Sequence, residues 1–198
     1  MRKLTIMNWD RGAGVLPTTH RRMTAEEYYQ LPEGPPYFQL IDGELFMSPS
    51  PHFFHQEIIG NIYSLIREYL RKHPIGKVVV APSDVEFDKD NIFQPDVFFI
   101  RNERLGIVDD HGAKGAPDLV IEVVSGSTGR LDVGPKKTIY AQKGVLEYWV
   151  VLPETREVEV YRLPESVDRP ALKLAEGETL TTPLLPELEL PLAEIFAR

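Results

Sequence analysis

The sequence predicts an α/β fold in which helices flank a mixed central β-sheet, with an additional β-hairpin near the N-terminus. Apolar residues recur at helical spacing over residues 55–72, which indicates a long helix with one face packed on a sheet. Residues 117–124 form a nearly continuous apolar run, typical of a strand covered on both faces. A helix-length segment separates this run from the next apolar strand, which indicates a βαβ unit.

Length and composition limit the classes of protein to consider. The 198 residues fit an N-terminal arm over 1–22, which lacks clear periodicity, and one domain over 23–198. The absence of cysteine excludes disulfides, thiolate metal sites and cysteine nucleophiles. The chain has neither an apolar run long enough to span a bilayer nor a secretory signal at its start, so we expect a cytoplasmic protein without membrane contact.

The net charge of −8 bears on the choice of partner. A protein that coats nucleic acid non-specifically relies on a broad positive field, which this composition does not provide. An enzyme acting on nucleic acid remains open, because a divalent cation offsets clustered catalytic carboxylates.

The first predicted elements are a short helix and a hairpin. Thr24 and Glu27 have the spacing of a capping box, so a helix should begin there and end near Leu31-Pro32. Asp42-Gly43 lies between the apolar segments 37–41 and 44–47 and predicts a two-residue hairpin turn. A serine-proline loop at 48–51 then leads into the helix over 55–72.

The middle of the chain predicts strands around one crossover helix. We expect a strand over 77–81 and 84–87, interrupted or bulged at Pro82, and a second strand over 93–100. The strand over 117–124 should lead through a loop at 125–130 into a helix over 132–143 that ends at Gly144. Strands over 146–152 and 156–162 form the next hairpin, and the proline-rich remainder adds short strands or irregular cover. Tyr148 and Trp149 are expected in the core.

Glu122 is the most informative single position, because it places a carboxylate inside an apolar strand. Strand alternation puts Asp118, Val120 and Glu122 on one face. A buried carboxylate has to be hydrogen-bonded, ion-paired or bound to a metal. A structural salt bridge and a metal ligand are therefore both open for Glu122.

Asp96 stands at the start of a second apolar strand. It is either a strand-start aspartate that bonds local backbone or one half of a carboxylate pair with Glu122, if the two strands are neighbours. Paired carboxylate oxygens at the edge of a sheet suit Mg²⁺, which prefers hard oxygen ligands.

The order of these motifs resembles the PD-(D/E)XK nuclease superfamily, whose members share the restriction endonuclease-like fold. Within it, the chain is most similar to a large bacterial family of restriction-endonuclease-like proteins, most of them without assigned biology. The segments that carry the resemblance lie at 40–45, 48–55, 94–97, 117–123, 132–140 and 144–149. Together they cover most of residues 24–162.

The resemblance implies a metal-dependent endonuclease that hydrolyses phosphodiester bonds of nucleic acid, with DNA as the expected substrate. Asp96 and Glu122 would hold one or two Mg²⁺ ions, with Mn²⁺ as a substitute. Nucleases of this type often cut both strands as dimers, and exposed hairpins offer edges for pairing, so a homodimer is expected.

One position departs from the pattern of the superfamily. The usual lysine lies two residues after the glutamate, and Val124 stands there in this chain. Lys136 is the expected substitute, because it shares a helical face with Asp132 and Tyr140 at four-residue spacing. Lys137 points about 100° away around the helix and is the weaker candidate. A surface lysine with no such role is the alternative for Lys136.

Two further residues complete the expected site. The resemblance suggests Glu44 as an additional acid near the metal, the alternative being an outward strand position. His55, at the start of the long helix, could contact phosphate or accept a proton, the alternative being a structural or surface histidine.

Two rival functions stay open. An inactive member could keep the fold as a nucleic-acid-binding or protein-interaction module, which Val124 and the acidic charge favour. A glycosidase could use an acid and base pair without a metal, although the chain shows no aromatic-lined sugar cleft.

Overall fold

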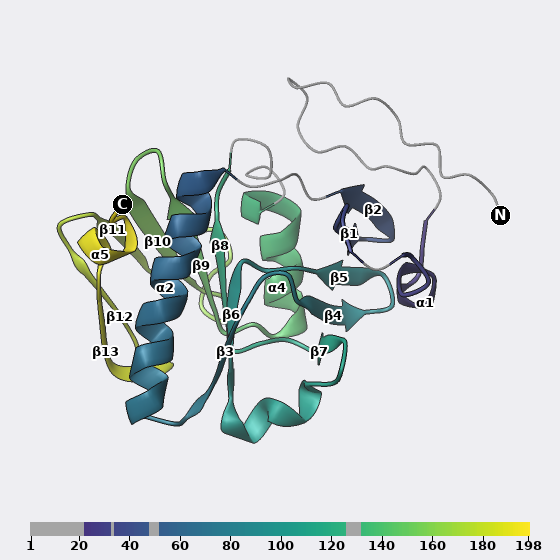
Figure 1. Ribbon diagram of the computed structural model, residues 1–198, viewed down its shortest axis with the longest axis horizontal. Helices are drawn as coiled ribbons and strands as arrows, with labels where there is room; N and C mark the ends of the chain where they lie inside the picture. Colours follow the sequence, from purple (N-terminus) through teal and green to yellow (C-terminus); the bar gives the residue numbers. More distant parts are fainter. Residues whose placement is uncertain (1–21, 33, 48–51, 126–131) are drawn as a thin grey trace.

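The computed structural model describes residues 22–32, 34–47, 52–125 and 132–198. Its centre is a six-stranded sheet with the order β11-β10-β9-β8-β6-β3 (Figure 1). The strands are β3 (Gly76–Val80), β6 (Val97–Arg101), β8 (Leu119–Val123), β9 (Glu147–Leu152), β10 (Glu157–Arg162) and β11 (Leu172–Ala175). Only β8 and β9 pair in parallel, and the other neighbours are antiparallel, so the sheet is mixed as expected.

Helices cover both faces of this sheet, as the apolar pattern predicted. The long helix α2 (Phe53–Lys72) packs on one face, and its isoleucines 58, 62 and 66 are fully buried (Figure 1). Leu119, Ile121 and Val123 of β8 belong to the same apolar cluster, whereas Val120 packs on the opposite side with α4 (Lys137–Lys143). β8 is therefore covered on both faces, which explains its continuous apolar run.

A second sheet has the order β2-β1-β5-β4-β7. Its strands are β1 (Phe38–Ile41), β2 (Glu44–Met47), β4 (Asp84–Asp88), β5 (Asn91–Phe93) and β7 (Gly112–Lys114). The predicted hairpin β1-β2 forms, with Asp42 and Gly43 at φ angles of 48° and 75°. Through the pairing of β1 with β5, the hairpin is part of this second sheet. The short helix α1 (Ala25–Tyr28) packs on it and has the predicted capping box between Thr24 and Glu27.

One long hairpin crosses from one sheet to the other, which confirms one prediction and corrects another. The predicted interruption at Pro82 is confirmed, since β3 ends before it and β4 begins after it. The prediction of one strand over 93–100 is wrong: β6 pairs with β3 in the first sheet, whereas β5 pairs with β4 in the second. The changes of sheet occur at Pro82 and Pro95, which have no N–H to continue a ladder. At the crossing, the N–H of Ala81 donates to the carbonyl of Asp96 over 3.0 Å. Asp96 therefore lies at the junction of the two sheets.

The crossover from β8 to β9 is helical, but it is not one regular helix. The π-helical turn η2 (Asp132–Lys136) contains Pro135 and continues into α4. The predicted helical segment over 132–143 is thus confirmed. Its first turn is not α-helical, because Pro135 cannot donate the hydrogen bond of an α-helical interior. Gly144, at φ 92°, ends α4 as predicted.

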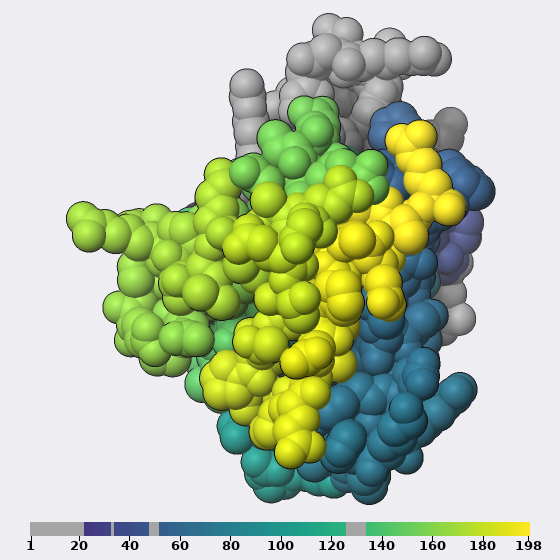
Figure 2. All heavy atoms as spheres, turned by 90° about the vertical axis from the view of Figure 1, so that its left-hand side faces the viewer, coloured from purple at the N-terminus to yellow at the C-terminus, as the bar shows by residue number. Residues whose placement is uncertain are grey.

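The C-terminal segment lies against α2. The strands β12 (Thr179–Thr182) and β13 (Leu185–Pro191) and the short helix α5 (Leu192–Ile195) share the apolar cluster of α2. Figure 2 shows these residues, in yellow, along the blue surface of α2. Tyr148 and Trp149 are fully buried, as predicted.

Three predictions fall on residues outside those that the structure describes: the arm apart from Arg22, the serine-proline loop at 48–51 and most of the loop at 125–130. A 3-10 turn, η1 (Asn102–Ile107), follows β6. Among the described residues, none of the helices combines the length and the apolar character needed to cross a membrane.

Candidate active site

Glu122 lies in β8 with its side chain only 4% exposed, and its carboxylate meets two side chains from the crossover. The ammonium of Lys136 lies 3.0 Å from Oε1 of Glu122, and Lys136 is itself 3% exposed. The hydroxyl of Tyr140 donates to the same oxygen over 2.6 Å. The carboxylate of Glu122 is thus buried, ion-paired and hydrogen-bonded at once.

The crossover positions these two donors because Lys136 ends η2 and Tyr140 follows four residues later in α4. Residues four apart lie on one face of a helix, so both reach the strand. Lys137 points elsewhere, with its ammonium 4.2 Å from the ring centre of Tyr161. The lysine expected from the helix therefore does reach Glu122, whereas Val124 packs beside the apolar cluster. The side chain of Asp132 lies outside the described part of the chain.

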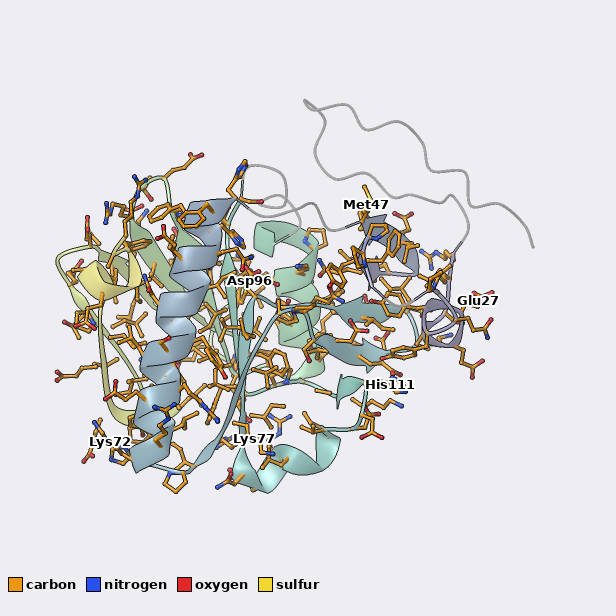
Figure 3. The ribbon with its side chains drawn as sticks, viewed as in Figure 1. Glu27, Met47, Lys72, Lys77, Asp96 and His111 are labelled. Carbon is orange, nitrogen blue, oxygen red and sulfur yellow. The ribbon has the colours of Figure 1, made fainter. Side chains whose placement is uncertain are left out.

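Asp96 is brought next to Glu122 by the pairing of β6 with β8. Val97 pairs with Ile121, so the same antiparallel register continued by one residue sets Asp96 opposite Glu122. Oδ2 of Asp96 accepts the backbone N–H of Val123 over 2.7 Å. The two strands that carry the acids are neighbours, as the sequence led us to expect. Figure 3 shows Asp96 between α2 and α4.

His55 joins the cluster from the first helical turn of α2. Its Nε2 lies 2.8 Å from the carbonyl oxygen of Val123 and 3.5 Å from Oδ2 of Asp96. Because a carbonyl oxygen only accepts, Nε2 carries the proton in this arrangement. One imidazole N–H therefore lies close to two oxygen atoms, one from each strand.

Glu44 does not share these contacts. It is an exposed residue of β2, paired across the hairpin with Ile41. Within the described residues, no hydrogen bond or ion pair connects Glu44 with Asp96, Glu122, Lys136 or His55. The structure thus brings together four of the five predicted residues and places Glu44 at an outward strand position.

The donor atoms can be tested against a divalent cation. The described residues contain no group of three or more histidine or acidic side chains that could hold a metal ion. A cation near the cluster would rely on the two carboxylates, Asp96 and Glu122, with the Val123 carbonyl as a backbone oxygen. Mg²⁺ binds proteins through one or two carboxylates and keeps several waters, so this set of oxygen atoms fits it.

A second buried acid lies at the other end of β8 and serves as a contrast. Asp118 is fully buried, and its Oδ1 accepts from Nε of Arg101 at 2.8 Å and from Nη1 of Arg104 at 3.0 Å. Its Oδ2 accepts the backbone N–H of Arg101 at 2.9 Å. Arg104 also donates to the carbonyl of Ala116 at 2.7 Å, which ties the cluster to the backbone. These contacts form a structural ion cluster.

Several contacts of the candidate site were not predicted from the sequence, among them that of His55 with Asp96. Tyr140 was placed on the face of Lys136 by its spacing, but its hydrogen bond to Glu122 was not foreseen. The contact of the Val123 carbonyl with His55 was not predicted either, because every residue has a backbone carbonyl and the sequence does not indicate which one will bind a side chain. The four-residue spacing of Lys136 and Tyr140 was the signal that could have identified the contact of Tyr140.

Comparisons with known proteins agree with this picture. The model of the Uma2 family, described as "Putative restriction endonuclease", matches residues 25–193. Among solved structures, a protein from Anabaena variabilis described as a "putative nuclease" superposes with a TM-score of 0.72. It is 22% identical, and the match covers 88% of this chain and 98% of that one, which shows a shared fold. No curated protein matches the chain.

Proposed function

Because the chain belongs to the Uma2 family, we propose that it is a metal-dependent endonuclease that hydrolyses phosphodiester bonds at Asp96 and Glu122. The family is one of restriction endonuclease-like proteins, and the chain has a nuclease-like fold. The observation that carries the proposal is the convergence of Asp96 and Glu122 on neighbouring strands, with Lys136 at 3.0 Å from Glu122.

In this proposal Asp96 and Glu122 hold the cation. A bound Mg²⁺, with Mn²⁺ as its substitute, would supply an activated water and neutralise charge on the phosphate. The backbone N–H of Val123 fixes Oδ2 of Asp96, and Tyr140 fixes Oε1 of Glu122. Both carboxylates therefore keep their orientation before substrate arrives, which lowers the cost of organising the site.

Lys136 has two roles in the proposed reaction. Its ammonium stabilises the ionised carboxylate of Glu122, which is almost fully buried. We propose that the same ammonium would also stabilise charge that develops on the phosphate, because a preorganised cation in a site of low dielectric stabilises such charge strongly. Lys136 would thus replace the strand lysine whose position Val124 occupies.

His55 is proposed to orient Asp96 and to donate its N–H to a phosphate oxygen when substrate is bound. The distance of 3.5 Å between Nε2 and Oδ2 of Asp96 supports the orienting role. Donation to a phosphate would replace the present contact of Nε2 with the Val123 carbonyl at 2.8 Å. Glu44 is not assigned a role in the reaction.

The partner and setting complete the proposal. We propose DNA as the substrate and a cytoplasmic homodimer as the acting form, because cleavage of both strands of a duplex needs two sites. One catalytic domain over residues 23–198 would provide each site.

A second candidate is a nucleic-acid-binding module without activity. The replacement of the strand lysine by Val124 and the net charge of −8 favour it. In that case the ion pair between Lys136 and Glu122 would serve the stability of the fold alone.

The test is a cleavage assay on plasmid DNA with Mg²⁺ or Mn²⁺, run on the wild type, Asp96→Asn and Glu122→Gln. We expect each variant to lose about 10³-fold in rate, because several kcal/mol of charge stabilisation disappear with the metal site. Glu68→Gln is the matched control, since Glu68 is exposed and, among the described residues, its ion pair is with Lys72 of the same helix. A chelator should abolish the wild-type rate.

Two outcomes would contradict the proposal. Cleavage that persists in both purified variants would remove the assignment of the site. DNA binding by the wild type without cleavage under any divalent cation would favour the second candidate. Anomalous density for Mn²⁺ between Asp96 and Glu122 in a crystal would test the metal site independently of any substrate.

A further inference from the structure

A cavity of about 290 Å³ lies on the second sheet, outside the candidate active site. Its walls come from α1 and the loop that follows it, from the start of β1, and from the connection between β3 and β4. His111, next to β7, closes another side. Figure 3 shows His111 on the side of the molecule near Glu27 of α1 and well away from Asp96.

The polar wall of this cavity is the carboxylate of Asp84. Oδ1 accepts from the hydroxyl of Tyr28 at 3.2 Å and from the side-chain amide of Gln94 at 2.8 Å. Within the described part of the chain, no hydrogen bond or ion pair is made to the other oxygen, Oδ2. The Tyr28 hydroxyl also lies 2.9 Å from the carbonyl of Phe38 and shares its one hydrogen between the two acceptors, so Gln94 is the main donor to Oδ1. Oδ2 is left as an acceptor for a ligand.

Aromatic rings form much of the remaining wall. Tyr28 and Tyr29 meet edge to face with ring centres 5.4 Å apart, and Tyr29 lies 5.5 Å from the ring of His111. Tyr37 and Phe38 also line the cavity, and Tyr37 is 42% exposed. The faces of such rings attract cations, and the attraction grows where water is excluded.

The charges around the cavity are mostly negative. Burial raises the pKa of the Tyr29 hydroxyl, and the carboxylates of Glu86, Asp84 and Asp109 raise it further. Lys114, which is outside the lining, pairs with Asp109 at 3.3 Å. Among the lining residues, His111 is the basic side chain. A negative potential of this kind repels phosphates and carboxylates and favours a cationic ligand.

We propose that this cavity binds a small organic cation, whose ammonium or guanidinium group donates to Asp84 while its apolar stem packs on Tyr29. The volume is near the lower limit of about 300 Å³ for small-molecule sites, so the ligand is a short amine or guanidine. A neutral molecule of the same shape lacks the charge that Asp84 and the rings recognise. The proposal does not depend on endonuclease activity.

The test uses agmatine as the probe and the full chain, with binding measured by titration calorimetry. We expect saturable binding by the wild type and at least about tenfold weaker binding of n-butylurea, a neutral probe, and of agmatine to Asp84→Asn. Asparagine keeps an acceptor for Tyr28 and Gln94, so the fold should survive, and a thermal melt checks this.

Variants at Tyr29 separate the ring from its hydroxyl. Tyr29→Leu should weaken agmatine binding about 3- to 30-fold, whereas Tyr29→Phe keeps the ring and should change it by less than about threefold. Glu122→Gln is the control for binding at the candidate active site and should bind agmatine like the wild type. A thermal melt fixes the temperature at which this variant is folded, because it leaves the ammonium of Lys136 without its counter-charge.

Three results would overturn the proposal. The first is no binding of agmatine at millimolar concentration, and the second is equal binding of n-butylurea. The third is agmatine binding that Asp84→Asn leaves unchanged but Glu122→Gln removes, which would place the cation at the other acidic cluster.

Discussion

The two ends of β8 carry two buried carboxylates, Asp118 and Glu122, on the same face of one strand. Asp118 is surrounded by two arginines and a backbone N–H. Glu122 meets Lys136 and Tyr140, and lies beside Asp96, which contributes a second carboxylate. Burial and charge are common to both, so they do not by themselves mark a functional site. The neighbours distinguish the two ends, because the end with Glu122 also has the carboxylate of Asp96, and our proposal assigns the metal site to these two acids.

The arginines also explain why Asp118 suits a structural role. Their planar guanidinium groups offer several donors in fixed geometry, which satisfies a carboxylate completely. Their side chains are 36% and 31% exposed, so they cover Asp118 while keeping contact with water. Asp118 itself is 0% exposed, whereas Asp96 beside Glu122 is 18% exposed, so a hydrated cation could reach an acid only at that other end of the strand.

The largest expected effect that sharpens this comparison is on stability. Asp118→Asn should lower the free energy of unfolding by about 3 kcal/mol, the lower end of the range for breaking a buried ion pair. The half-exposed arginines can regain hydration, which limits the loss. Chemical denaturation measures this change, and the cleavage rate of the folded fraction should stay within about threefold of the wild type. A folded Asp118→Asn protein that does not cleave would break the comparison.

A smaller effect is expected from replacing the ion pair of Glu122 as a whole. Glu122→Gln alone leaves the buried ammonium of Lys136 without its counter-charge, which is strongly destabilising. Adding Lys136→Met should recover about 2 kcal/mol in denaturation experiments, since apolar replacements of buried pairs are often neutral or better. Cleavage should remain absent in the double variant. Recovered cleavage would show that this pair is structural, like Asp118.

The smallest effect concerns Asp84, an acid that is neither fully buried nor ion-paired among the described residues. Burial raises its pKa above the ordinary value of 3.8, although hydrogen bonds from Gln94 and Tyr28 oppose this. The folded state therefore favours the protonated acid, and this contribution to stability is lost as pH rises through the folded-state pKa. Asp84→Asn should then be slightly more stable than the wild type at pH 7, with the gain shrinking toward pH 4.

Thermal unfolding at several pH values, without any organic cation present, measures this difference. A variant less stable than the wild type at pH 7 would show that ionised Asp84 stabilises the fold, as Asp118 does.

Much of the candidate site followed from local features of the sequence. A carboxylate inside an apolar strand identified Glu122, and four-residue spacing identified Lys136 together with the face of Tyr140. Glu44 was expected at the site only because of the resemblance. In the structure it is an exposed residue of the hairpin, where no packing holds its side chain near the other acids. The contacts of His55 with Asp96 and the Val123 carbonyl needed the packed structure, since they join residues far apart in the chain.

The sequence by itself determined the elements whose causes are local: the capping box of α1, the Asp42-Gly43 turn, the apolar face of α2 and the crossover ending at Gly144. These depend on residues within a few positions of each other, where propensity and hydrogen bonding act directly. Only the tertiary structure decided that one hairpin divides between two sheets at Pro82 and Pro95. That choice depends on which distant strands are available for pairing and burial, and no short segment contains this information.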